Sequence, residues 1–263
     1  FMFEQGISVT GKGPVVIFLH SSLSSSNQWQ KLAQVLSKKF TCVNVDLLGY
    51  GNARDVENEA DYNFSTEIER IKNVIGEIKP NEKYHLIGHS CGGAIALKMA
   101  VEHPEHLLSL AIYEPVAFHL FKSSNVDCAS DIFFKTKQFA ESLLSLDKSS
   151  ATKMFVDFWN GDGFFEALPE KAQQMMSKGI DKVNLDFNGI FNEEYSFEAL
   201  FNIHCPCLVL YGLYSPDASK LLSKYIVKHL TNVQTEEIPA GHMGPISHGK
   251  IVNSLIIDFY QRQ

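Results

Sequence analysis

The chain has 263 residues, of which 45% are hydrophobic and 20% are charged, and its formal net charge is −7. This composition is typical of a globular protein and not of a disordered chain, and the length suffices for one sizeable core. Because the net charge is negative and no basic cluster occurs, nucleic acid and an anionic membrane surface are poor partners for it. No window approaches the roughly 18 uninterrupted apolar residues of a membrane span.

The cysteines do not form a pattern that predicts disulfides. They are odd in number and scattered, at positions 42, 91, 128, 205 and 207. Cys205 and Cys207 are too close for a comfortable bridge, and no second pair completes a zinc site. We therefore expect a reducing compartment, the cytoplasm. Residues 1–4 lack the basic segment and apolar run of a signal peptide, although a chain that begins with Phe leaves a removed leader open.

Strand and helix patterns alternate through the first 115 residues. Continuous apolar runs predict strands at residues 15–19, 41–45, 107–113 and before the turn at Gly88. Helical periodicity predicts helices at residues 29–36, from a Thr66/Glu69 capping box to Pro80, and from the Gly88 turn to His103. This order predicts a largely parallel sheet with helices on both faces, which binds ligands beyond the carboxyl ends of its strands.

The strand pattern stops between residues 116 and 201, where helical stretches take over. We expect this segment to be a helical lid inserted into a core domain of residues 1–115 and 202–263. Aromatic residues concentrate in it, and most of them are expected to join the lid to the core. Some, with Phe118 and Trp159 as candidates, are expected to line an apolar substrate pocket. Strands at 207–211 and 233–238 and helices at 218–230 and 250–260 complete the predicted core.

The segment Gly88-His89-Ser90-Cys91-Gly92 lies where a predicted strand runs directly into a helix. Glycines two residues before and two after Ser90 remove side chains that would collide in so sharp a turn. The Ser90 hydroxyl is then presented at a helix N-terminus, where unpaired N–H groups and the helix dipole favour negative charge. The sequence therefore predicts that Ser90 is a nucleophile.

A serine hydroxyl needs a base to take its proton. The best candidate is His242, because it lies on the loop that follows the last strand and can reach over the turn. His248 is the second choice. His20 and His89 belong to the motifs around them, and the other histidines near helix ends have structural explanations.

The Gly-x-Ser-x-Gly turn, with these elements around it, resembles the nucleophile elbow of the α/β-hydrolase superfamily, in its lid-containing, serine-nucleophile, esterase-like branch. The resemblance covers nearly the whole chain in the order serine, acid, histidine. It implies the α/β-hydrolase fold, with a mostly parallel central sheet, helices on both faces and an inserted helical lid. It implies a catalytic Ser90 and His242, with neither a metal nor another cofactor.

The resemblance also implies an acid three residues after the glycine that ends the strand following the lid, but Ser215 stands there. Glu114 and Asp217 are the alternatives. Asp217 can be explained as the N-cap of a helix that begins at Ala218. A carboxylate at the buried end of an apolar strand is costly without a partner, which favours Glu114.

Two backbone donors for an oxyanion are implied at Cys91 and at Ser22. The loop His20-Ser21-Ser22 departs from the His-Gly-x of relatives and could add a hydroxyl to the pocket. His20, Ser21, His89 and Met243 are expected around the pocket with the two lid aromatics named above.

The leading hypothesis is a serine hydrolase that cleaves a small apolar ester, thioester or similar acyl substrate through an acyl-enzyme. A hydrolase of carbon–carbon bonds with the same triad, and a non-catalytic member that binds a small ligand, are the alternatives. A metal hydrolase that uses His20, His242 and His248 with Asp46 lacks a compact ligand spacing. Substrate identity and oligomeric state do not follow from the sequence.

Overall fold

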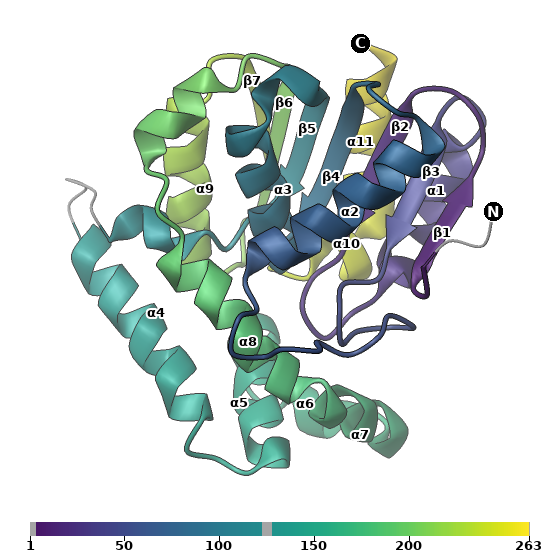
Figure 1. Cartoon of the computed structure of the whole chain (residues 1–263). Coiled ribbons are helices and arrows are strands. Elements are labelled where there is room, and N and C mark those ends of the chain that lie inside the picture. Colours follow the sequence, from purple (N-terminus) through teal and green to yellow (C-terminus); the bar gives the residue numbers. More distant parts are fainter. Residues whose placement is uncertain (1–3, 123–127, 263) are drawn as a thin grey trace.

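The structure is a computed structural model, and it describes residues 4–122 and 128–262. Within them, seven strands form one sheet in the order β1-β3-β2-β4-β5-β6-β7 (Figure 1). All neighbouring strands are parallel except β1 and β3. The strands are β1 (Ile7–Thr10), β2 (Val15–Leu19), β3 (Thr41–Val45), β4 (Tyr84–His89), β5 (Leu107–Tyr113), β6 (Cys207–Gly212) and β7 (Val233–Ile238).

The strand order reverses beside β4. The chain places β3 on one side of β2 and then returns to place β4 on the other side, after which β5, β6 and β7 continue in that direction. Connections therefore diverge between the carboxyl ends of β2 and β4, which is where open α/β sheets bind their ligands. Ser22 follows β2 and Ser90 follows β4, so both lie at this point.

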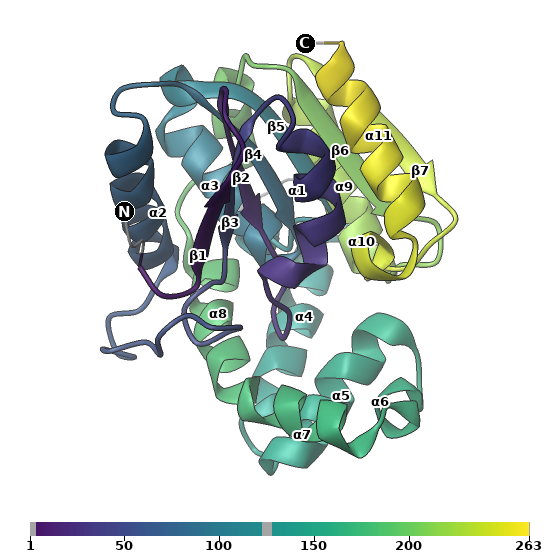
Figure 2. The ribbon, with the colours of Figure 1, turned by 90° about the vertical axis from the view of Figure 1, so that its right-hand side faces the viewer.

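Helices cover both faces of the sheet, as predicted. Along β2, Ile17 faces the core cluster that includes α2, α3 and α9, while Phe18 faces the cluster formed with α1 and α11. Figure 2 views the sheet nearly edge-on, with α2 on one side and α1 and α11 on the other. The covering helices are α1 (Gln30–Leu36), α2 (Phe64–Ile78), α3 (Cys91–Glu102), α9 (Asp217–His229) and α11 (Gly249–Gln261). Short helices η1 (Ser26–Trp29), η2 (Pro104–His106) and α10 (Gly244–Ser247) lie in the connections.

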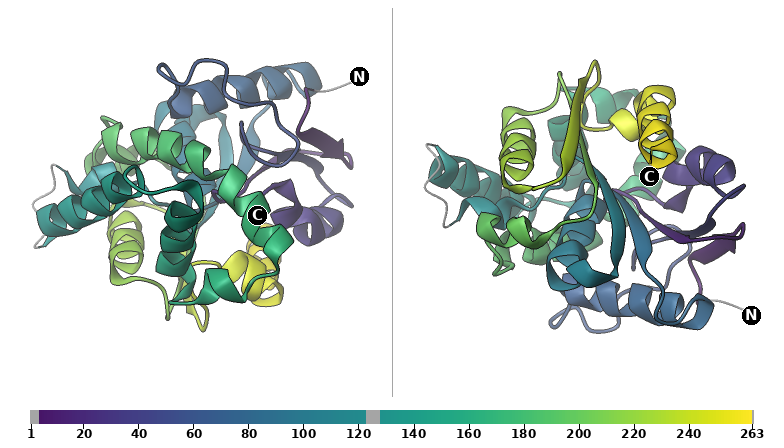
Figure 3. Two further views of the ribbon diagram at one scale, coloured as in Figure 1. Left: turned by 90° about the horizontal axis from the view of Figure 1, so that it is seen from below. Right: turned by 90° about the horizontal axis from the view of Figure 1, so that it is seen from above.

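A helical insert separates β5 from β6. Figures 1 and 2 show its helices α4–α8 gathered beyond one end of the sheet, and the view from below in Figure 3 shows them in front of it. The carboxyl end of β5 leads directly into the insert, so this is the end of the sheet that Ser90 also occupies. The insert consists of η3 (Phe118–Phe121), α4 (Ala129–Leu143), α5 (Lys148–Asn160), α6 (Phe164–Ala167), α7 (Glu170–Lys178), α8 (Ile180–Asn192) and η4 (Phe197–Asn202).

The fold class and the strands at 15–19, 41–45, 107–113 and 233–238 are confirmed. Strand β1 was not predicted, because its four residues alternate between partly buried and exposed positions without a continuous apolar run. No helix among the described residues has the length and apolarity that crossing a membrane demands. The expectation that the chain begins without a signal peptide concerns residues 1–4, and residues 1–3 lie outside the described part of the chain.

Two predicted helix starts were wrong. Helix α2 begins at Phe64, because Asn63 caps it: the Asn63 side chain accepts from the Ser65 N–H at 2.9 Å. Thr66, at the third helical position, completes the capping box: its hydroxyl oxygen accepts from the Asn63 N–H at 3.5 Å. Glu69 therefore has no part in the capping box. Helix α9 begins at Asp217, with Pro216 at the N-cap position, so Asp217 is not a cap.

Candidate active site

Ser90 lies in a strained turn between β4 and α3. Its backbone has φ +55° and ψ −118°, its N–H donates to the Tyr113 carbonyl at 3.0 Å, and its carbonyl accepts from the Ala94 N–H at 2.9 Å. A Cβ atom added to Gly88 would lie 2.5 Å from the carbonyl oxygen of Gly92, and one added to Gly92 would lie 2.4 Å from the carbonyl oxygen of His20. Only glycine fits at these two positions, for the steric reason that the sequence suggests.

His242 joins Ser90 to a carboxylate. Its Nε2 lies 2.9 Å from Ser90 Oγ, and its Nδ1 lies 2.6 Å from Glu114 Oε2. Because an ionised carboxylate only accepts hydrogen bonds, Nδ1 carries the proton and Nε2 is free to accept from the serine hydroxyl. The His242 and Glu114 side chains are 1% and 0% exposed, so water does not compete for these contacts.

Glu114 is held by three donors. Oε1 accepts from the Gly212 N–H at 2.7 Å, and Oε2 accepts from the Ser219 hydroxyl at 3.0 Å as well as from His242. Burial would raise the pKa of Glu114, but the hydrogen bonds from His242 and Gly212 outweigh it and hold the pKa below its ordinary value. The carboxylate is therefore ionised. The backbone of Glu114 is strained, with φ +41°, and its contacts must hold it in this conformation.

The alternative residues lie elsewhere. The Asp217 side chain is fully exposed and pairs with Lys220 at 3.0 Å. His248 is also exposed, and its Nδ1 lies 2.9 Å from the Ser247 hydroxyl. Of the candidate acids and bases, the structure thus brings Glu114 and His242 to Ser90, and neither Asp217 nor His248.

The loop that carries His242 is fastened at three places. The buried ring of His89 donates from Nε2 to the His242 carbonyl at 2.8 Å, and burial lowers its pKa, which keeps it neutral. The Tyr113 hydroxyl donates to the Gly241 carbonyl at 2.7 Å. Trp159 stacks on the imidazole of His242, with ring centroids 3.8 Å apart and planes at 26°.

The loop after β2 lies against the turn of Ser90. The Gly92 N–H donates to the His20 carbonyl at 3.2 Å, and Ser22 lines the same cavity as Ser90. Cys91 begins α3 directly after Ser90, so its N–H is one of those that a helix leaves without an internal partner. Ser22 and the start of α3 thus lie next to the Ser90 hydroxyl.

Three residues expected around the pocket, His20, Ser21 and His89, line neither of the two cavities that adjoin the site. His20 is buried, its Nδ1 donating to the Ser21 carbonyl at 2.7 Å and its Nε2 accepting from the Leu47 N–H at 2.9 Å. The Ser21 hydroxyl donates to Gln28 at 3.1 Å and adds nothing to the cavity lining. These residues, with His89, hold loops in place. They were expected near the pocket because they adjoin the catalytic motifs in the sequence, but in the structure their side chains hydrogen-bond to residues that do not line the cavities.

Both ring nitrogens of His20 are used in hydrogen bonds, so a metal could not replace either bond without breaking this loop. Burial lowers the His20 pKa to about 4, so the ring is neutral and its Nε2 can accept the Leu47 hydrogen bond. Within residues 4–122 and 128–262, no three or more His, Cys, Asp or Glu side chains gather into a group that could hold a metal.

Two cavities adjoin the site. The inner one, with about 30 Å³ of free space, contains Ser90, and uncharged side chains line it: Ser22, Ser90, Val116, Phe118, Thr136, Phe139, Phe155, Phe158, Trp159, Val183, Phe187, Ile190 and Phe191. The outer one has about 560 Å³ and is lined by residues that include Met243, Asn160, Tyr214 and Ser247. Phe158 and Trp159 line both, so they form the wall between them.

Sequence reasoning missed Tyr113, Ser219 and Asp186. The first two fasten the His242 loop and Glu114, and Asp186 accepts from the Ser22 hydroxyl at 2.9 Å. Each partner lies roughly a hundred residues or more away in the chain. No local pattern marks such contacts.

A mostly parallel sheet with a Gly-x-Ser-x-Gly turn at its switch point defines a class of proteins. Over residues 14–248 the sequence matches the family described as the alpha/beta hydrolase fold, so the chain belongs to the α/β-hydrolase family.

Two curated relatives, each about 30% identical, are similar over part of the chain. A segment of 112 residues is 31% identical to fluoroacetate dehalogenase of a Burkholderia species and covers 40% of this chain and 36% of that protein. A segment of 106 residues is 30% identical to pimeloyl-[acyl-carrier protein] methyl ester esterase of Nitrosomonas europaea and covers 40% and 39%. The matches thus span less than two fifths of either curated relative.

A solved structure is similar over nearly the full length. The enol-lactonase of Burkholderia xenovorans LB400 superposes with a TM-score of 0.77, covering 98% of this chain and 96% of that one, at 14% sequence identity. At that identity the similarity concerns the fold alone.

Proposed function

We propose that the protein is a serine hydrolase that cleaves a small, apolar carboxylic ester or thioester through an acyl-enzyme. The observation that carries this proposal is the buried, hydrogen-bonded chain from Ser90 through His242 to Glu114. Acyl transfer by serine requires three groups: a nucleophile, a base whose free nitrogen points toward the nucleophile, and an acid that fixes the tautomer of the base.

In the proposed mechanism, His242 takes the hydroxyl proton as Ser90 Oγ attacks the substrate carbonyl. The oxyanion that forms accepts from the N–H groups of Cys91 and Ser22, each worth about 3 kcal/mol of transition-state stabilisation in comparable sites. The imidazolium, stabilised by Glu114, returns its proton to the leaving alcohol or thiol. A water molecule, activated by His242, then releases the acid and restores Ser90.

The inner cavity supports an uncharged, apolar acyl group. Aromatic rings dominate its lining, and a carboxylate buried there would meet no cation among the lining residues. This argues against the carbon–carbon bond hydrolases that take substrates with an additional carboxylate. About 30 Å³ holds roughly two water molecules, so an acyl group needs the surrounding side chains of the insert to give way. We therefore propose that the helical insert of residues 116–201 acts as a lid.

The compartment proposed is the cytoplasm. All five cysteines are free, including Cys128 at the surface, which is consistent with a reducing environment.

The test is turnover of p-nitrophenyl acetate, butyrate and octanoate and of a matching thioester by the wild type and by Ser90→Ala. We expect saturable hydrolysis by the wild type, and a loss of about a million-fold in kcat in the variant. Ser254→Ala, an exposed serine on α11, is the control and should retain wild-type rates. Stoichiometric ester binding without turnover by folded wild-type protein would point to a ligand-binding member of the family instead.

A further inference from the structure

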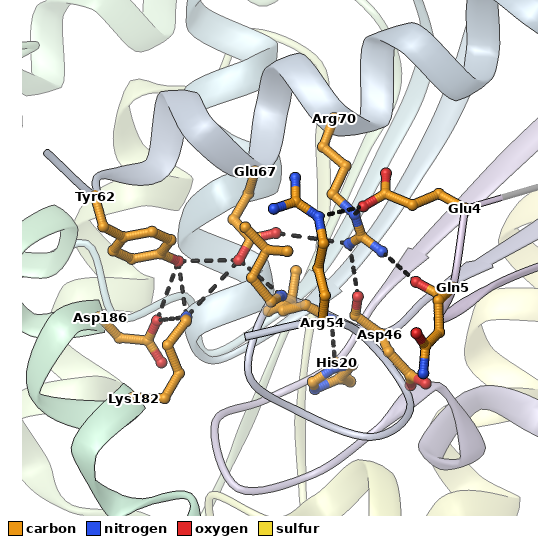
Figure 4. Close-up of polar contacts among 12 residues, drawn as sticks. Glu4, Gln5, His20, Asp46, Arg54, Tyr62, Glu67, Arg70, Lys182 and Asp186 are labelled. Atoms are coloured by element: carbon orange, nitrogen blue, oxygen red, sulfur yellow. Dashed lines mark hydrogen bonds and ion pairs between the residues drawn. The ribbon is translucent and has the colours of Figure 1, made fainter. Parts of the chain in front are cut away.

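A buried polar cluster joins helix α8 of the insert to the core (Figure 4). Lys182 and Asp186 come from α8, Glu67 from α2 and Tyr62 from the preceding loop, and all four side chains are buried. Lys182 Nζ contacts Asp186 Oδ1, donates to the Tyr62 hydroxyl at 2.8 Å and lies 3.7 Å from Glu67 Oε1. Burial lowers the pKa of Lys182, but Asp186 and Glu67 outweigh it and raise the pKa, so the lysine stays charged.

Asp186 extends this cluster to the loop that follows β2. Its Oδ2 accepts from the Ser22 hydroxyl at 2.9 Å and from the Tyr50 hydroxyl at 2.7 Å, while Oδ1 faces Lys182. Since Asp186 is 0% exposed, its charge is balanced by these groups and not by water. Ser22 in turn lines the inner cavity beside Ser90.

The same loop is strained at the next residue. Leu23 has φ +55°, a conformation that a leucine keeps only when its surroundings enforce it. Leu23 packs on Gly179, just before α8, where an added Cβ would lie 2.9 Å from Leu23 Cδ2. The α8 region thus holds the loop at two consecutive residues, by a hydrogen bond at Ser22 and by close packing at Leu23.

We propose that Asp186 is a positioning residue for the oxyanion hole, which it sets by holding the Ser22 hydroxyl and thereby the backbone N–H of Ser22. This inference rests on the proposed function, in which that N–H faces the oxyanion. Asp186 does not touch the substrate in this proposal. Its consequence is that the oxyanion hole is complete only while α8 is seated on the core.

The test compares kcat and KM for p-nitrophenyl butyrate in the wild type, Ser22→Ala, Asp186→Asn and the double variant. Ser22→Ala keeps the backbone N–H and leaves Asp186 with Lys182 and Tyr50, so this variant should fold. We expect each single change to lower kcat about tenfold or more and to change KM less than about twofold, because the donor acts mainly on the transition state. The double variant should lose no more than the worse single variant, because both changes remove one link.

A second readout separates positioning from mere stabilisation. Ser90 Oγ adds to the carbonyl carbon of a trifluoromethyl ketone while His242 takes the hydroxyl proton, and the hemiketal that forms carries an oxyanion. The affinity of the ketone should therefore weaken in parallel with kcat in both single variants. The matched control is Asp181→Asn, which removes an exposed carboxylate of the same helix that pairs only with Lys148 in the contacts described. It should leave kcat and the ketone affinity unchanged.

Wild-type kcat and ketone affinity in folded Ser22→Ala and Asp186→Asn would overturn the inference and leave only a structural link. If Asp186→Asn does not fold, Ser22→Ala decides alone. A folded wild type with neither turnover nor a fluorophosphonate adduct would instead overturn the proposed function, and this inference with it.

Discussion

Glu114 and His242 lie 128 positions apart in the sequence, yet Glu114 Oε2 and His242 Nδ1 are 2.6 Å apart in the folded chain. Glu114 directly follows β5 and His242 follows β7, so the sheet brings them together across β6. The proposed acid thus reaches the imidazole from the end of β5, while Ser215, three residues after Gly212, is buried and has no carboxylate.

Glu114→Gln should lower kcat for a p-nitrophenyl ester by about ten-thousandfold, as loss of a triad carboxylate does, because the amide no longer fixes the tautomer of His242. Fluorophosphonate labelling should slow in parallel. The measurement is steady-state kinetics with circular dichroism as a check of folding. Asp217→Asn is the matched control and should stay near the wild-type rate, since Asp217 is exposed and pairs with Lys220. The reverse ranking would transfer the role of the acid to Asp217.

Trp159→Ala should widen acyl-chain preference. Its indole stacks on His242 and, with Phe158, separates the inner cavity from the outer one. Removing it should raise kcat/KM for the octanoate ester relative to the acetate ester by about tenfold, in line with the worth of one or two methylenes in a hydrophobic pocket. Phe164 lines the outer cavity but not the inner one, so the control variant Phe164→Ala should leave this ratio unchanged. An unaltered ratio in Trp159→Ala would mean that the indole is not the wall of the acyl pocket.

Buried histidines should make the fold sensitive to mild acid. Burial lowers the pKa of His20, His85 and His119 to about 4 each, below the ordinary value of 6.5. Between these values the unfolded chain binds protons that the folded chain excludes, so stability is full above about pH 6.5 and falls as the pH drops toward 4. Each shift corresponds to a loss of about 3 kcal/mol at most. Glu114, whose pKa is lowered, contributes its stability above about pH 4.5 and loses it only below that value.

His85→Gln tests this pH dependence away from the active site. His85 lies on β4 with its Nδ1 2.7 Å from the Ser109 hydroxyl. Urea midpoints measured from pH 8 to pH 4.5 should fall less steeply in this variant than in the wild type. His204→Gln changes an exposed histidine and should reproduce the wild-type slope. If His85→Gln keeps the wild-type slope, burial of His85 is not a source of the acid sensitivity.

Local patterns in the sequence indicated the features that depend on local sterics or on the burial of a charge. The turn at Ser90 follows from its flanking glycines, and the cost of an unpaired carboxylate after an apolar strand pointed to Glu114. Membership in a motif was a poor guide to which residues line the cavity, since the rings of His20 and His89 hydrogen-bond to backbone carbonyls and do not line it. Asp186 could not be predicted, because an acidic residue in a helix is normally exposed and only the packing of α8 on the core buries it.

The insert shows the same limit. Aromatic content predicted an apolar pocket wall, and Phe118 and Trp159 do line the inner cavity. Which other rings join them depends on how α4, α5 and α8 pack against one another and on the core, and such packing leaves no periodic signal in the sequence. Whether the insert opens as a lid remains a prediction.

The most direct measurement is fluorophosphonate labelling of the wild type and of Ser90→Ala, read by intact mass and peptide mapping. If Ser90 is an activated nucleophile served by His242 and Glu114, the wild type gains one adduct rapidly, on the peptide that contains Ser90, and the variant gains none. A folded wild type that remains unlabelled, or an adduct that persists in Ser90→Ala, would contradict the proposed serine mechanism.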